Sequence, residues 1–220
     1  MAQATFLTLV NDVLKRLREP VCSATTDTAY STLIGIFVNE AKREVEDAWQ
    51  WSALRSTIDL SMVIAQRNYT LTGSSNRTKF LGVYNTSSKW QMKQYMQNDY
   101  LNNLLSLTTA ASASPYEFDV VGTDSATGSL TIRVNPLPTA TDTIRFFTIN
   151  PQAEFTSDST TLLVPKEPVI QLAYLKAINE RGEDAGRASE VQEKIYLRTL
   201  GDAIAQDEAR YGGETTWQAV

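Results

Sequence analysis

The chain has 220 residues, of which 42% are hydrophobic and 20% charged, and its formal net charge is -5 at pH 7. This composition is typical of one or two domains with an apolar core. One cysteine and no histidine exclude an intrachain disulfide, the usual zinc and haem sites and every histidine-dependent nucleophile. We therefore expect no metal and no cofactor. No apolar run approaches the roughly 20 residues of a membrane span. We therefore also expect no membrane segment, and we expect the protein to be made in the cytosol.

The basic residues are scattered along an acidic chain. Proteins that hold nucleic acid neutralise phosphates with clustered Lys and Arg, so specific DNA binding is not expected. An acidic wall past which DNA slides without sticking is compatible with this composition.

The first predicted helix runs from Thr5 to Arg18, because Phe6, Val10 and Leu14 recur on one face. Pro20 ends it. A second predicted helix covers 27–51.

In the second helix, the wide apolar arc includes Ile34, Val38 and Val45, and the polar face contains Lys42, Arg43, Glu46 and Asp47. Asp27 is predicted to cap its N-terminus, and Trp51 to pack where the period changes from helical to alternating. Glu44 lies inside the apolar arc, so it should pair with Arg18 or Arg181.

Residues 53–161 follow the period of two that is typical of β-strands, as in Ile58–Leu60–Met62 and Leu130–Ile132–Val134. Turn-rich clusters and prolines divide this region into six to eight strands. One helical interruption is predicted over 93–107, followed by a flexible loop over 108–114 that orders only against a partner.

Helical periodicity returns over 166–181, where apolar residues lie nearly all round, so this helix should be enclosed and end at Gly182. A last helix is predicted over 187–211. It has two apolar stripes on opposite faces: Ala188, Val191 and Ile195 on one, and Leu197, Leu200, Ile204 and Tyr211 on the other. Two stripes indicate two partners, whereas a kink at Gly201 would turn both towards one core.

The tail from Gly212 carries Trp217 four positions from its end. An aromatic residue there either fills a pocket on a partner or docks back on its own domain. The predicted interface residues are therefore Leu197, Leu200, Ile204, Tyr211, Trp217 and Val220.

No nucleotide, nucleophile-elbow or Cys-x-x-Cys motif is present. Two carboxylates alone could serve a glycosidase, and acid-rich spots occur at Glu44, Glu46 and Asp47, at Glu183 and Asp184, and at Asp207 and Glu208. Apart from Glu44, these lie on predicted helix surfaces or in a helix turn, where a solvated face is the commoner explanation, and for Glu44 a structural ion pair is the commoner one, so no catalytic residue is assigned.

Four stretches carry a resemblance to a known family: FLTLVNDVLKRLRE over 6–19, VNEAKREVEDAWQWSALRS over 38–56, QRNYTL over 66–71 and FLGVYN over 80–85. The chain resembles the head-to-tail adaptor, or connector, proteins of short-tailed bacteriophages. The resemblance implies a ring, commonly a dodecamer, beneath the portal protein in the virion. Such a ring extends the channel for genome ejection, docks tail nozzle or fibre proteins, and sends a C-terminal arm onto the portal.

We therefore predict an α+β fold. An antiparallel helical bundle is built from 1–52 and 162–211, with an inserted β-sandwich or barrel-like domain over 53–161 and an arm over 212–220. The predicted function is that of a structural virion protein made in the host cytoplasm, without enzyme activity. The alternatives are a virion-associated, carboxylate-dependent peptidoglycan hydrolase and a stand-alone β-sandwich binding module.

Overall fold

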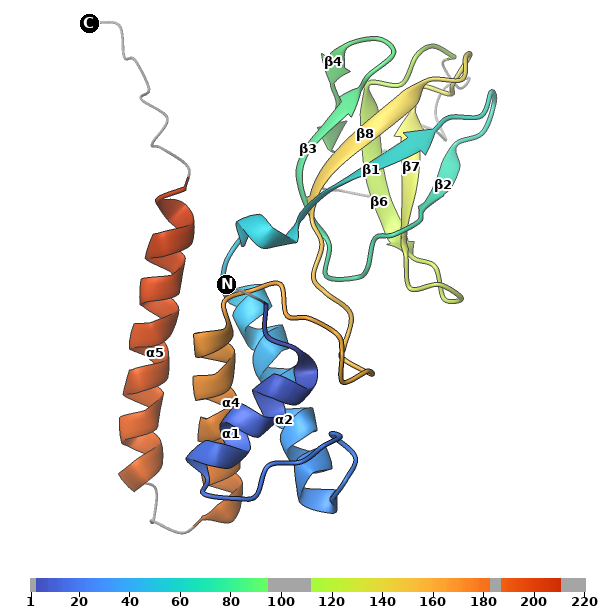
Figure 1. Cartoon of the computed structure of the whole chain (residues 1–220). Coiled ribbons are helices and arrows are strands. Elements are labelled where there is room, and N and C mark those ends of the chain that lie inside the picture. Colours follow the sequence, from blue (N-terminus) through green and yellow to red (C-terminus); the bar gives the residue numbers. More distant parts are fainter. Residues whose placement is uncertain (1–2, 95–111, 183–186, 211–220) are drawn as a thin grey trace, which may run out of the picture. The chain divides into compact units, whose positions relative to one another are not determined.

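The computed structural model describes residues 3–94, 112–182 and 187–210. In this part the chain forms four α-helices and two four-stranded sheets (Figure 1), which confirms the predicted α+β class. It divides into a helical unit, residues 1–54 with 152–220, and a β unit, residues 55–151. Residues 152–161, expected in the β-rich insertion, therefore group with the helices. None of the described helices is long and apolar enough to cross a membrane.

The helical unit contains α1 (Phe6–Arg16), α2 (Ala29–Ala48), α4 (Lys166–Arg181) and α5 (Arg187–Glu208). Helix α4 packs against the other three, and Figure 1 shows α5 alongside it. Gly182 ends α4 in the left-handed conformation with φ 64°. The predicted bounds of α4 are correct, but its enclosure is only partial, because Tyr174, Leu175 and Ile178 are half-buried.

The N-terminus of α2 differs from the prediction. Thr28 caps the helix by accepting from the backbone N–H of Ser31, while the Ser31 hydroxyl accepts from the Thr28 N–H. The Asp27 carboxylate instead accepts from the N–H of Ala24 and from the N–H and hydroxyl of Ser23, and these bonds lower the pKa of Asp27. Asp27 therefore closes the preceding turn, and its prediction as the helix cap is wrong.

The C-terminal end of α2 leads into Trp51, which is buried. The helix ends at Ala48, and the Trp51 indole N–H donates to the carbonyl of Val45 at 2.7 Å. A short 3₁₀ helix, η1 (Ser52–Leu54), follows before the first strand. The indole thus satisfies a carbonyl that the end of the helix leaves without an intrahelical partner.

Half of the predicted polar face of α2 is covered: Lys42 and Glu46 are buried, contrary to prediction, whereas Arg43 and Asp47 are exposed. The side chains of Lys42 and Glu46 are 1% and 0% exposed, with Nζ and Oε1 3.4 Å apart. Lys42 Nζ also donates to the carbonyls of Gln152 at 2.7 Å and Ala153 at 2.9 Å. The ammonium lies 5.0 Å from the centre of the Phe155 ring. Residues 152–155 therefore bind to the side of α2 that the periodicity predicts to face solvent.

Two more contacts hold the same segment on α2. The Asn39 amide donates to the carbonyl of Phe155 and accepts from its N–H, at 3.1 and 2.8 Å. Glu46 accepts from the N–H of Gln152 at 3.3 Å. Polar side chains of α2 thus form the hydrogen bonds that the backbone N–H and C=O groups of this irregular segment need.

Glu44 does not occupy a buried position. Its side chain is 52% exposed and pairs with Lys176 of α4 at 2.8 Å. Arg181 instead pairs with Glu19 and donates to the Tyr30 hydroxyl. The predicted pairing of Glu44 with Arg18 or Arg181 is wrong, because Glu44 lies at the rim of the apolar arc.

The β unit consists of two sheets. One has the order β1-β8-β3-β4 and the other β2-β7-β6-β5. All pairs are antiparallel except β5 with β6. The strand bounds are β1 Arg55–Ser61, β2 Asn68–Leu71, β3 Lys79–Asn85, β4 Trp90–Gln91, β5 Lys93–Gln94, β6 Glu117–Thr123, β7 Leu130–Asn135 and β8 Thr143–Ile149.

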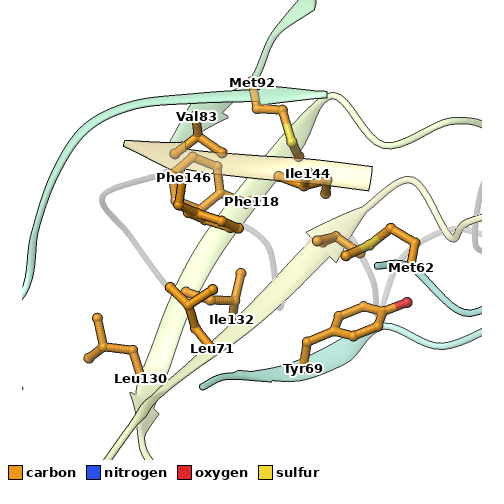
Figure 2. Packing of buried hydrophobic residues seen from close by; sticks show 11 residues of the cluster. Met62, Tyr69, Leu71, Val83, Met92, Phe118, Leu130, Ile132, Ile144 and Phe146 are labelled. Carbon is orange, nitrogen blue, oxygen red and sulfur yellow. The ribbon is translucent and has the colours of Figure 1, made fainter. Parts of the chain in front are cut away.

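Alternate side chains of the two sheets fill one core. Figure 2 shows Val83, Ile144 and Phe146 of the first sheet facing Leu71 and Ile132 of the second, with Phe118 among them. The Phe118 and Phe146 rings meet edge to face, with centroids 5.8 Å apart. Both sheets therefore have one apolar inner face and one outer face.

The predicted helix over 93–107 is wrong at its start, where Lys93 and Gln94 form β5. The rest of that range, and residues 108–111 of the predicted loop, lie outside the described residues. Ser112 forms a β-bridge with Leu137. Ser114 bonds to Asp142 and accepts from the Asn85 amide. This end of the predicted loop is therefore fixed by its own domain, not by a partner.

Replacing Lys42 tests the segment 152–155. Lys42→Met removes the donor for two carbonyls and leaves the buried Glu46 carboxylate without its cation. We expect the free energy of unfolding to fall by about 3 kcal/mol, measured by urea denaturation followed by circular dichroism. Lys166→Met, at a side chain that is 52% exposed, should change it by less than about 0.5 kcal/mol. Equal effects of the two substitutions would contradict a stabilising role for Lys42.

Candidate interaction surfaces

Helix α5 packs on α4 through a face that is only partly apolar. Gln192, Ala203 and Asp207 are buried, and the Gln192 amide donates to the Gln171 side-chain oxygen at 2.6 Å. Leu200 and Ile204 are half-buried at the border of this face. Neither of the two predicted apolar stripes of α5 therefore lies at the centre of its contact with α4.

Both apolar stripes of α5 contain exposed residues. Val191 is 59%, Ile195 42% and Leu197 56% exposed. The helix continues without interruption through Gly201. Of the predicted interface residues, Leu197 is exposed and Leu200 and Ile204 are half-buried, whereas Tyr211, Trp217 and Val220 lie outside the described residues.

Most of the carboxylates considered for catalysis lie apart on helices. Glu46 is paired with Lys42, and Asp207 accepts from the N–H of Ser52 at 2.9 Å. Glu44, Asp47 and Glu208 are exposed, and Glu183 and Asp184 lie outside the described residues. Within the described ranges, no group of three or more Cys, Asp or Glu side chains could hold a metal ion.

The helical unit has a groove of about 660 Å³ between the segment 162–168 and the C-terminal half of α5. Trp51, Leu162 and Pro168 line it on one side, and Asp202 and Arg210 on the other. Arg210 is the last described residue before the tail. The last described residue of the helical unit therefore lies at the rim of this groove.

The β unit has a second hollow, of about 730 Å³, on the outer face of β1, β8 and β3; we call it the sheet hollow. Its apolar residues are Leu81, Tyr84 and Phe147, each 40 to 42% exposed. The Tyr84 and Phe147 rings are 5.8 Å apart at an interplanar angle of 82°. Together they form an apolar corner on a face that is normally polar.

Gly82 makes room for this corner. A Cβ at Gly82 would lie 3.1 Å from Cε2 of Tyr84, so the tyrosine ring occupies the space that a side chain would need. The sheet hollow was not predicted from the sequence. A usable signal is the pair Phe146 and Phe147, because adjacent strand residues point to opposite faces and only one can lie in the core.

Charged groups border the sheet hollow. In the strand register Asp59 and Tyr84 lie opposite Arg145, and the guanidinium binds both Asp59 oxygens at 2.8 Å. The hydrogen bond from Arg145 lowers the pKa of Asp59. Arg55 and Lys79 lie opposite Ile149 at the end of the same strand. Of these charged residues, Arg55 and Arg145 line the sheet hollow, and Arg145 is paired with Asp59.

Exposed apolar groups on a helix and on the outer face of a sheet are typical of a protein that works through contacts with other proteins. The comparison with protein families agrees: the SU10 adaptor protein model matches residues 4–218. The chain belongs to this family, which confirms the resemblance to phage head-to-tail adaptors. A search of curated proteins gave no match.

The Asp59–Arg145 pair gives a pH prediction. Because the folded pKa of Asp59 is lowered, the pair is intact above the ordinary value of 3.8 and is lost as the pH falls through the lower folded value. In Arg145→Met the Asp59 pKa should rise to about 3.8, measured by NMR titration of the carboxyl carbon. Asp124, whose pKa is lowered chiefly by the Thr127 hydroxyl, should titrate unchanged. An unshifted Asp59 in the variant would refute the assignment.

Proposed function

We propose that this chain is a structural virion protein that forms a homo-oligomeric ring below the portal and joins the head to the tail. The observation that carries the proposal is the family match over residues 4–218, because it includes both the helical unit and the β unit. The ring continues the DNA channel and presents a surface for tail nozzle or fibre proteins. The protein acts by assembly, without a reaction of its own.

The exposed surfaces support a ring. In a closed ring each subunit uses one face to bind a different face of the next subunit. Helix α5 packs on α4 with one face and leaves Val191 and Leu197 exposed on two others. Such residues have no role in the core of one unit, so a neighbouring subunit accounts for them.

The charge distribution supports passage of DNA without binding. Residues 1–54 and 152–220 contain 12 basic and 19 acidic residues, a net charge of -7, whereas residues 55–151 contain 8 basic and 6 acidic residues, a net charge of +2. An acidic surface repels phosphates. The helical unit therefore suits the channel, and DNA crosses it without specific contacts.

The assembly itself is the decisive measurement. Native mass spectrometry of the purified protein should give a monomer, and addition of its portal should give a portal-bound ring with one adaptor per portal subunit, commonly twelve. Portal contact orders the subunits and raises their local concentration, which favours the ring. A folded protein that never associates with the portal would overturn the proposal.

The tail supplies a second test. We expect the segment from Gly212 to Val220 to bind the portal, with Trp217 as its main apolar contact. Deletion of 212–220 should abolish portal co-sedimentation without changing thermal unfolding, and Trp217→Ala should weaken it at least tenfold. Gln218→Ala is the matched control and should bind normally. Unchanged binding after the deletion would remove the tail from the portal contact.

A further inference from the structure

The groove between the segment 162–168 and the C-terminal half of α5 is mainly apolar; we call it the α5 groove. Trp51, Leu162 and Pro168 line it with buried side chains, and Leu163 lines it with a side chain that is 38% exposed. Its volume of about 660 Å³ lies within the usual range for ligand pockets. The helical unit therefore contains an apolar site large enough for an aromatic side chain.

The end of α5 is fixed beside this groove. Nη1 of Arg210 donates to the Ser52 hydroxyl at 3.0 Å and lies 3.4 Å from Oδ1 of Asp207. Asp207 in turn accepts from the N–H of Ser52 at 2.9 Å. The last turn of α5 is thus joined to the residue that follows Trp51, and both Trp51 and Arg210 line the groove.

The residues that follow Arg210 are long enough to reach the groove. Its wall on α5 extends from Thr199 to Arg210, about 17 Å at the rise of an α-helix. The seven residues from Arg210 to Trp217 span at most about 25 Å. Gly212 and Gly213 permit the left-handed backbone at which helices commonly end and chains turn back. A tail that turns back along α5 therefore places Trp217 in the groove.

The composition of the tail suits this site. From Gly212 to Val220 it has a single charged residue, Glu214, and Trp217 is its one aromatic residue. A buried indole ring contributes a large apolar area, and its N–H needs a hydrogen-bond acceptor. The α5 groove offers apolar side chains below and the exposed, polar Asp202 on its α5 wall.

The covalent connection selects the tail of the same chain over that of another copy. A short tether gives an effective concentration of about 1 mM, so a contact with a dissociation constant of about 0.1 mM is formed about ten to one. Another copy at about 10 µM would fill the same groove only about a tenth of the time. A short terminal contact of this kind is lost on heating before the helical unit unfolds. Deletion of the tail therefore leaves thermal unfolding unchanged.

We propose that in the free subunit the tail turns back and Trp217 occupies the α5 groove of its own chain. The portal then competes for the same tryptophan, which leaves the groove in order to bind. The competition step rests on the proposed function, whereas the docking does not. Docking within the chain covers the indole until a portal is present, so that free copies do not associate through it.

Fluorine NMR of the full chain tests the docking in the absence of the portal. 5-Fluorotryptophan labels all four tryptophans, and the change of each fluorine shift between H₂O and D₂O increases with the exposure of the indole. Trp51, which is 1% exposed, and Trp90, which is 40% exposed, are the internal references. The Trp217 signal, assigned with Trp217→Phe, should change less than that of Trp90.

Concentration separates the two possible sources of the tail. The Trp217 signal should be the same at about 20 µM and about 500 µM, because a tethered contact does not depend on concentration. A Trp217 signal that changes more than that of Trp90 at both concentrations would overturn the inference. Protection at the higher concentration alone would assign the groove to the tail of another copy and would overturn it as well.

Substitutions in the groove test where the indole lies. Leu163→Asp places a carboxylate among the apolar side chains, so the Trp217 signal should become more solvent-sensitive than that of Trp90, with unchanged circular dichroism. Ala53→Glu, at an exposed position in the same groove, tests the site if the first variant does not fold. Val191→Asp, at a residue 59% exposed outside the groove, is the matched control and should leave Trp217 unchanged. A Trp217 that stays protected in a folded groove variant lies elsewhere, which contradicts the inference.

Portal affinity tests the competition step. A released tail is fully available, so Leu163→Asp should bind the portal about tenfold more tightly, by the factor that favoured the docked state. Weaker or unchanged binding of the folded variant would refute the competition. If the unmodified chain does not bind its portal, the proposed function and the competition step both fail, and the docking is decided by the fluorine signal alone.

Discussion

The helical unit depends on one buried cation. Lys42 of α2 donates to the carbonyls of Gln152 and Ala153, with Glu46 beside it, and so fixes the segment that begins immediately after the β unit ends. An irregular segment has no ladder of its own to satisfy its carbonyls, and a buried ammonium needs several acceptors. The Lys42 ammonium therefore satisfies the carbonyls of residues 152 and 153, and these carbonyls satisfy the ammonium. The segment that follows the β unit thereby becomes part of the helical unit.

The periodicity of apolar residues predicts those helices and strands that have one apolar face buried in a core. The helix over 166–181, the α+β class and the alternating strands could all be predicted, because one apolar face suffices to define each. Lys42 and Glu46 could not, because the helical period places them only at the edge of the apolar face that contains Val38 and Val45, where a polar side chain can be covered or exposed. What covers that polar face is a segment more than 100 residues away, and its position depends on the tertiary fold.

The same limit applies at the ends of elements and at the sheet hollow. Asp27 and Thr28 are both good caps by residue type, and only the extended backbone of Thr28 places its oxygen on the first turn. At the hollow, Gly82 and Tyr84 are brought beside Phe147 by strand pairing between β3 and β8. The apolar helix stripe with Leu197 could be predicted, since a helix is a local structure, whereas the sheet hollow depends on the register of the strands.

Each of these two surfaces contains a glycine. Gly82 lets Tyr84 lie over the sheet, and Gly201 leaves the backbone of α5 open, with nothing near the position of a side chain. A glycine in a helix weakens that helix, and no packing among the described residues requires one at Gly201. In the proposed ring, a neighbouring subunit would account for such exposed positions, including the phenylalanine and the tyrosine on the outer face of a sheet. Close packing between subunits of that proposed ring would offset the local cost in each monomer, so both surfaces would be better satisfied in the assembled state than in the free chain.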